Sequence, residues 1–182
     1  MPEQNKMVTL VNRRGEVIGH APELEVHMPG QRRKHRGLQV LVWSPDRKEL
    51  IIRYRSNGED AEKWANAVIT HISQCENFFS AAIRELQTGL GIVLTQAQAI
   101  ARLRPLFVKE PVLGTKMHLL EVYSFVLYSG EIIVSKDMLK SITFDGVRSM
   151  MYGTPDISPQ FRLVINDFRR KFVSGPLWRN RL

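Results

Sequence analysis

The apolar residues between positions 79 and 90 recur with the spacing of a helix. They fall at every third or fourth position: Phe79, Ala82, Ile83, Leu86 and Leu90. Because residues three and four apart share one face of a helix, this stripe predicts an amphipathic helix packed against a core. A second helix is predicted from Ser158-Pro159 onward, because these two residues favour a helix start. Its apolar face consists of Phe161, Val164, Ile165 and Phe168.

Shorter apolar segments that end at turn residues predict strands. Two of them, 7–11 and 16–20, flank Asn12-Arg13-Arg14-Gly15 and predict a hairpin. Residues 64–72 are expected to be extended. Further strands are predicted at 38–43, 49–54, 100–108 and 117–128.

Two segments interrupt this pattern. Residues 21–37 contain prolines, glycines and many charges, which predict a loop. Residues 137–140 are predicted to begin a short helix. The whole pattern is compatible with an α/β protein.

A chain of 182 residues fits one domain with an ordinary core. We expect a single domain over residues 1–172 and a basic tail over residues 173–182. No apolar run approaches the roughly 18 residues needed to cross a bilayer, so no membrane association is expected. The first residues lack the pattern of a secretory signal, and the single cysteine, Cys75, cannot form an internal disulfide. These features favour a cytoplasmic protein.

The net charge of +8 favours anionic partners. Basic residues concentrate at 32–36 and at 169–171. A phosphorylated small molecule would need only two or three of these charges. Nucleic acid would use more of them, but no helix-turn-helix, zinc-finger or RNP-type signature is present. Nucleic acid is therefore not the expected partner, solvated basic surfaces remain an alternative, and the oligomeric state stays open.

Residues 70–92 read T-H-I-S-Q-C-E-N-F-F-S-A-A-I-R-E-L-Q-T-G-L-G-I, which resembles the Nudix box G-x5-E-x7-R-E-U-x-E-E-x-G-U. The positions that match are Glu76, Arg84, Glu85, Leu86, Gly91 and Ile92. Thr70 stands in place of the first glycine, and Thr88 and Gly89 stand in place of the paired glutamates. The resemblance implies a Nudix fold: an α/β/α sandwich with a mixed central sheet, the box helix on one face and the terminal helix on the other.

Further residues resemble the isopentenyl-diphosphate isomerase branch of the Nudix superfamily. They are V-N-R-R-G-E-V-I-G near the start, then His27, His35-Arg36, Arg55-Ser56 and Thr70-His71. The resemblance implies that His27, His35, His71 and Glu121 hold a divalent metal. Imidazole and carboxylate ligands suit Zn²⁺ or Mn²⁺. A purely structural role for the histidines remains an alternative.

The same resemblance assigns roles to the other site residues. Leu119 occupies the place of a second metal-binding glutamate, and Ile69 that of the isomerase cysteine, so isomerase activity is not expected. Glu85 and Glu76 are the candidate catalytic carboxylates for Mg²⁺-dependent hydrolysis. Arg84 is expected to brace the box by pairing with a glutamate such as Glu76. The residues expected to contact a diphosphate are Arg53, Arg55 and Lys63.

Nudix hydrolysis needs several carboxylates around Mg²⁺, and this box keeps too few of them. The sequence therefore predicts a protein that binds a diphosphate-containing small molecule, with ordinary hydrolysis weak or lost. One alternative is an active hydrolase or isomerase-like enzyme that uses Mg²⁺, Mn²⁺ or Zn²⁺ at the histidine site. Another is a protein or RNA interaction module on a Nudix scaffold.

Overall fold

The computed structural model describes residues 6–12, 14–28, 33–44, 48–56, 61–109, 119–127, 139–153 and 156–168, with 104–109 and 119–127 described by their backbone. Its strands are β1 (Met7–Val11), β2 (Val17–Pro22), β3 (His35–Ser44), β4 (Glu49–Arg55), β5 (Lys63–Asn66), β6 (Val68–His71), β7 (Arg104–Lys109), β8 (Leu119–Leu127) and β9 (Leu139–Thr143). Its helices are α1 (Glu23–His27), α2 (Phe78–Leu90), α3 (Gln96–Arg102), α4 (Phe144–Gly153) and α5 (Pro159–Phe168).

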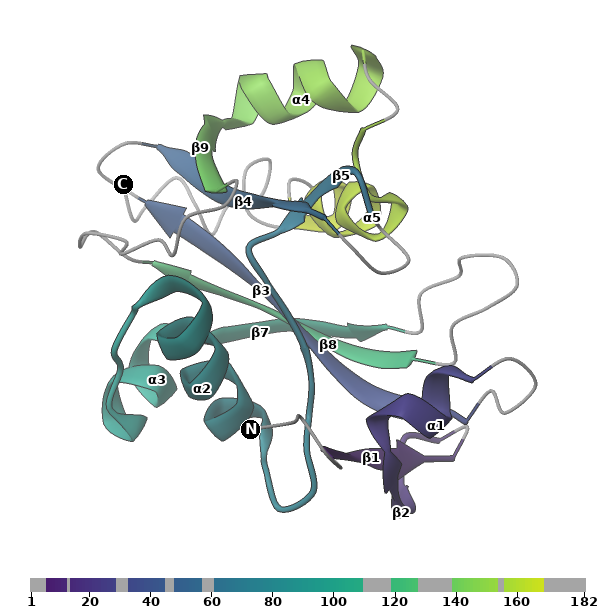
Figure 1. Cartoon of the computed structure of the whole chain (residues 1–182). Helices are drawn as coiled ribbons and strands as arrows, with labels where there is room; N and C mark the ends of the chain where they lie inside the picture. Colours follow the sequence, from purple (N-terminus) through teal and green to yellow (C-terminus); the bar gives the residue numbers. More distant parts are fainter. Residues whose placement is uncertain are drawn as a thin grey trace.

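Strand β3 is the centre of a mixed sheet (Figure 1). It pairs antiparallel with β1, β4 and β6, and parallel with β8. The main path through the sheet runs β2-β1-β3-β4-β5, while β9 pairs with β4 and β7 pairs with β8. The predicted mixed central sheet is confirmed.

The two faces of β3 pack against different helices. Leu38 and Val40 lie in one core cluster with Leu86 of α2. Leu41 lies in a second cluster with Phe161 of α5. Because successive side chains of a strand point to opposite faces, α2 and α5 must cover opposite sides of the sheet. The predicted α/β/α sandwich, with the box helix and the last helix on opposite faces, is confirmed.

The box helix α2 has clear local signals at both ends. Asn77 caps its N-terminus by accepting a hydrogen bond from the amide of Ser80 (2.9 Å), and the Ser80 hydroxyl pairs in return with the Asn77 amide. Gly91 ends the helix with a φ of 67°, a left-handed conformation that glycine adopts without steric cost. The predicted helix at 79–90 therefore begins at Phe78 and ends at Leu90.

The loop predicted for residues 21–37 is wrong at both ends. Helix α1 forms at Glu23–His27, and β3 begins at His35. The amide of Glu23 donates to the carbonyl of Lys6 (2.8 Å), and Val26 is buried against the first hairpin. The helix thus depends on contacts with a distant strand, which local composition does not reveal.

The strand predicted at 100–108 is also misplaced at its start. Residues up to Arg102 belong to α3, which is capped by Thr95 and Gln98, and only Arg104–Lys109 form a strand. The side chain of Ile100 is exposed on this helix, whereas Ala99 is buried in the core around α2.

The short helix predicted at 137–140 is wrong as well. Its described residues belong to β9, which pairs with β4, and helix α4 begins only at Phe144. Sheet pairing here overrides local propensity. The hairpin of β1 and β2 is confirmed. Residues 117, 118 and 128 of the predicted strand, and the tail at 173–182, lie outside the described residues. None of the described helices is long and apolar enough to cross a membrane.

Candidate functional site

The three charged residues that match the Nudix box, Glu76, Arg84 and Glu85, form one network around Arg84. Its Nε and Nη2 donate to the two carboxylate oxygens of Glu76, at 2.6 and 3.0 Å, and its Nη1 pairs with Glu85. Burial alone would raise the pKa of Glu76, but the hydrogen bonds from Arg84 and Ser73 outweigh it and lower that pKa. Arg84 Nη2 also approaches the His71 carbonyl, at 3.3 Å. This is the geometry that a bracing role for Arg84 requires.

The carboxylate of Glu85 is already engaged within the protein. Its Oε1 accepts hydrogen bonds from Arg84 and from the Thr70 hydroxyl (2.9 Å). The Thr88 hydroxyl donates to the Arg84 carbonyl within the helix (2.9 Å), and Gly89 offers no side chain. Mg²⁺ requires a nearly octahedral set of oxygen ligands. One ion-paired carboxylate does not supply this set, so the described residues of the box do not fit a Mg²⁺ site.

A guanidinium lies beside Gly89, the position at which the Nudix pattern has its second glutamate. Arg53 of β4 donates from Nη2 to the carbonyl of Gly89, at 2.7 Å. A Cβ atom placed on Gly89 would lie 3.6 Å from the same Nη2. Burial lowers the pKa of Arg53, the nearby Arg55 lowers it further and Glu85 raises it. An arginine remains protonated under such shifts, so a positive charge is fixed at this end of α2.

The other two residues predicted to contact a diphosphate lie close to Arg53 in the sheet. Arg53 and Arg55 alternate along β4 and therefore share a face, and Arg55 pairs across the ladder with Lys63 of β5. All three side chains are partly buried. Their contact with phosphate stays a prediction.

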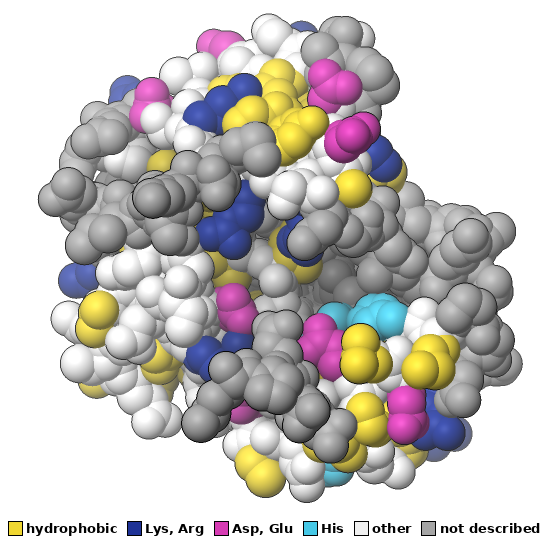
Figure 2. All heavy atoms as spheres, viewed as in Figure 1, with side chains coloured by type: hydrophobic (Ala, Val, Ile, Leu, Met, Phe, Trp, Pro, Cys, Tyr) yellow, Lys and Arg dark blue, Asp and Glu magenta, His cyan; other side chains and the backbone are white. Residues whose placement is uncertain are grey.

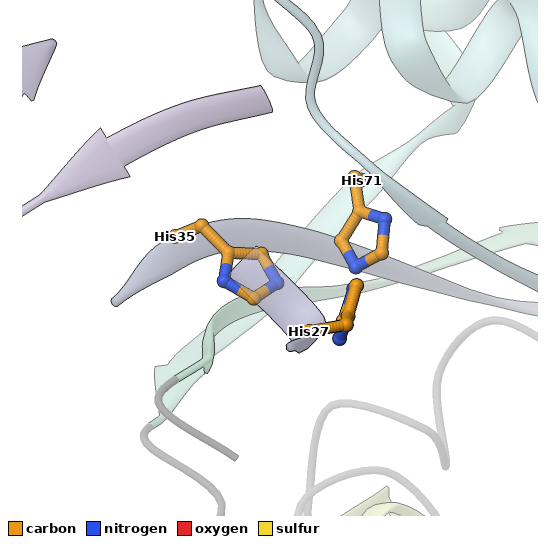
Figure 3. Close-up of side chains that lie close together, drawn as sticks. All are labelled: His27, His35 and His71. Atoms are coloured by element: carbon orange, nitrogen blue, oxygen red, sulfur yellow. The ribbon is translucent and has the colours of Figure 1, made fainter. Parts of the chain in front are cut away.

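The second cluster is a triad of histidines from three elements, His27 at the end of α1, His35 at the start of β3 and His71 at the end of β6. Their ring centroids are 4.8 to 5.0 Å apart. One nitrogen of each ring lies within 4.8 Å of the others. Figure 3 shows the three rings gathered around a common centre. The structure thus brings together three residues that are separated by up to 44 positions in the chain (71 minus 27).

Hydrogen bonds orient the rings of His35 and His71. His35 donates from Nδ1 to the Arg33 carbonyl (2.9 Å), which leaves Nε2 as its lone-pair nitrogen. That Nε2 is buried and has no hydrogen-bond partner among the described residues. Burial lowers the pKa of His35 to about 4, and the bond to Arg33 opposes this only in part. His35 is therefore neutral at pH 7 with a buried lone pair, as a metal ligand must be.

Glu23 is a site residue that the sequence reasoning missed. Its Oε1 accepts a hydrogen bond from His71 Nδ1 (2.8 Å), and its Oε2 forms an ion pair with Lys6 Nζ (3.4 Å). The hydrogen bond from His71 lowers the pKa of Glu23 to about 2, against the effect of burial. Such a carboxylate orients the ring so that Nε2 of His71 faces the cluster (Figure 3). The signal lies in the sequence, since Glu23 precedes His27 by one helical turn, but segment 21–37 was predicted to be a loop.

The fourth predicted metal ligand, Glu121, lies at the same level of the sheet as His71. Gly37 of β3 pairs with His71 on one side and with Glu121 on the other. Residues directly opposite one another in a sheet share a face, so the register places position 121 on the face of His71. Metal binding by Glu121 stays a prediction.

Neighbouring residues of β6 serve the two clusters. Thr70 hydrogen-bonds to Glu85 of α2, while His71 hydrogen-bonds to Glu23 of α1, because successive residues of a strand point in opposite directions.

In Figure 2, histidine and acidic side chains border a hollow in this face of the molecule, and Lys and Arg side chains line the other side of it. The buried, unpartnered nitrogen of His35 and the three imidazoles fit a transition metal such as Zn²⁺ or Mn²⁺.

The pKa of His35 leads to a prediction for metal-free protein. The pKa of His35 falls from 6.5 to about 4 on folding. Between pH 6.5 and pH 4, His35 is therefore protonated in the unfolded chain and neutral in the folded chain. Stability from this group is fully present above pH 6.5 and should fall by up to roughly 3 kcal/mol as the pH drops to 4. Urea denaturation in EDTA at several pH values measures this change.

His35→Gln is the matched variant for the pH experiment. It should show a clearly smaller loss of stability between pH 6.5 and 4.5, because it lacks the titrating ring. Glu23 does not interfere, since a pKa lowered from 4.5 to about 2 removes stability only below pH 4.5. Equal pH dependence in both proteins would contradict the prediction.

The sequence matches no protein-family model and no curated protein. Solved structures do resemble the chain. DR0079 from Deinococcus radiodurans is 17% identical, with a TM-score of 0.67 over 88% of this chain and 97% of that one. A MutT Nudix hydrolase from Burkholderia pseudomallei is 17% identical, with a TM-score of 0.57 over 72% of this chain and 95% of that one.

A third similar structure carries a ligand. The Nudix domain of NrtR from Shewanella oneidensis, in complex with ADP-ribose, is 13% identical, with a TM-score of 0.58 over 82% of this chain and 98% of that one. At such low identities the likeness concerns the fold. Together these structures show that the chain has the fold of the Nudix hydrolases.

Proposed function

We propose that this chain, which has the Nudix fold, binds a diphosphate-containing small molecule and that Mg²⁺-dependent hydrolysis at its box is weak or lost. The engagement of Glu85 by Arg84 and Thr70 is the observation that carries this proposal. A Mg²⁺ ion would have to displace both partners and would then find neither of the paired glutamates. Ordinary Nudix chemistry therefore lacks its metal cage.

Arginines support the binding half of the proposal. Arg53 and Arg55 lie on one face of β4, and Arg53 reaches Gly89 near the end of the box helix. A guanidinium fork matches the oxygens of a phosphate group. A similar fold in NrtR holds ADP-ribose, which contains a diphosphate. Nucleoside diphosphates, their sugar conjugates and isoprenoid diphosphates are the ligand classes to test first.

A second candidate function is metal-dependent catalysis at the histidine triad, which the buried lone pair of His35 favours. His27, His35 and His71 would hold the ion, with Glu121 as a further candidate ligand and Glu23 as the residue that orients His71. A bound Zn²⁺ or Mn²⁺ would act as a Lewis acid on a phosphate oxygen. Hydrolysis fits these residues better than isomerisation, because Ile69 and Leu119 cannot exchange protons with a substrate.

Calorimetry and a phosphate-release assay test the two candidates together. The chain should bind at least one member of a panel of nucleoside and isoprenoid diphosphates, and it should release little phosphate with Mg²⁺. Release with Mn²⁺ or Zn²⁺ that disappears in His71→Ala would establish the second candidate. Strong Mg²⁺-dependent release that is lost in Glu85→Gln would refute the loss of ordinary hydrolysis.

A further inference from the structure

A glycine and an arginine meet at the position where the Nudix box carries its second glutamate. Gly89 lies within α2, with a φ that is not positive, so its backbone conformation does not demand glycine. Glycine also lowers helix stability relative to alanine. A residue that weakens its helix and has no conformational reason calls for another explanation. The neighbouring atoms supply it.

The space beside Gly89 is occupied by a positive charge. Arg53 Nη2 donates to the Gly89 carbonyl at 2.7 Å, and Nη2 and Nη1 would lie 3.6 and 3.9 Å from a Cβ at this position. A glutamate at position 89 would place its carboxylate directly against this guanidinium. The absence of a side chain leaves the guanidinium uncovered on that side.

The charges around Arg53 favour an anion from outside. Among the described residues, Arg53 donates to one neutral carbonyl, which uses one of its five N–H groups. Glu85, the carboxylate whose charge acts on it, is already paired with Arg84. Arg55 adds a second positive charge on the same face of β4. An anion with several oxygens would satisfy these donors.

We propose that Arg53 takes the place of the divalent cation at this Nudix box, so that the chain binds a diphosphate group directly and without metal. This inference rests on the proposed binding of a diphosphate and specifies how it is achieved. The glutamate that would hold a cation is replaced by glycine, and the positive charge comes from β4. The site then binds an anion, and the guanidinium of Arg53 supplies the positive charge that a metal ion would otherwise supply.

Calorimetric titration of the full chain with inorganic pyrophosphate in EDTA tests the proposal. The natural chain should bind pyrophosphate without metal, and Arg53→Met should weaken binding by at least about tenfold, as expected for the loss of charged hydrogen bonds. Arg53→Lys should fall between the two, because it keeps the charge and loses the fork.

Position 89 provides a test that leaves Arg53 in place. Gly89→Glu should weaken pyrophosphate binding in EDTA by about tenfold, because the new carboxylate pairs with Arg53. Gly89→Ala adds only a Cβ at an ordinary contact distance and should bind several-fold more tightly than Gly89→Glu. Arg102→Met removes an exposed arginine from α3 and should match the natural chain. The unfolding temperature of each variant shows whether it is folded. If Arg53→Met does not fold, Gly89→Glu tests the role of Arg53 in its place.

The outcomes distinguish metal-free binding through Arg53 from diphosphate binding in general. Binding that requires a divalent cation, or binding in EDTA that is equal in the natural chain and in folded Arg53→Met or Gly89→Glu, overturns the role of Arg53 alone. Failure of the natural chain to bind pyrophosphate or any diphosphate of the panel, with or without metal, overturns the proposed function as well.

Discussion

His71→Ala should lower the Zn²⁺ affinity of the histidine triad by at least about 100-fold. The substitution removes one of three imidazoles whose ligand atoms lie within 4.8 Å of one another, and no other described His, Cys, Asp or Glu joins this group. Zn²⁺ sites in proteins use at least three protein ligands, with water able to take the fourth place, and two imidazoles fall below this number. Competition against a fluorescent chelator measures the affinity, and elemental analysis of dialysed protein measures the stoichiometry.

Two further variants interpret the result. His20→Ala removes an exposed histidine of β2 that lies outside the triad and should bind Zn²⁺ like the natural chain. Glu23→Gln keeps all three imidazoles but weakens the hydrogen bond that orients His71, so it should reduce the affinity by about 10- to 100-fold. If His71→Ala and His20→Ala retain equal affinity, the triad is not the metal site.

Arg84→Met should lower the free energy of unfolding by about 2–4 kcal/mol, because it leaves Glu76 and Glu85 partly buried without their shared partner. The two carboxylates would then repel each other or take up protons. The third lost contact, to the His71 carbonyl, joins α2 to β6. For a chain of this length the unfolding temperature should fall by roughly 5–10 °C, which calorimetry or circular dichroism measures.

Arg102→Met is the matched control for charge and size, since Arg102 is exposed at the end of α3. It should change the unfolding temperature by no more than a degree or two. Arg84→Lys should lie between, because an ammonium cannot make the two parallel bonds to Glu76. An Arg84→Met protein as stable as the control would show that the network around Arg84 contributes little.

Local patterns identified the elements whose signals lie within a few residues. The helix at 79–90 was predicted from its apolar stripe, and the structure moves its start by one residue to Phe78. The hairpin of β1 and β2 followed in the same way from a turn between two apolar segments. Such elements are predictable because side-chain spacing and caps act over one or two turns.

Elements that depend on distant partners were missed. Strand β9 forms because β4 offers an edge for pairing, and α1 forms where its first amide meets the Lys6 carbonyl. Neither partner is visible in the segment itself. The same reason hid Glu23, whose role follows only from its position beside His71.

By itself the sequence determined the order of the residues that resemble a Nudix box, including Thr88 and Gly89 at the places where that pattern has paired glutamates, and it named three histidines as candidate ligands. The tertiary structure alone decided what those substitutions mean. It placed Arg53 against Gly89, 36 residues further along the chain, and it fixed the ring of His35 so that its lone pair is buried. Motifs specify which side chains are present, whereas charge placement and ring orientation depend on contacts between strands and helices that are far apart in the chain.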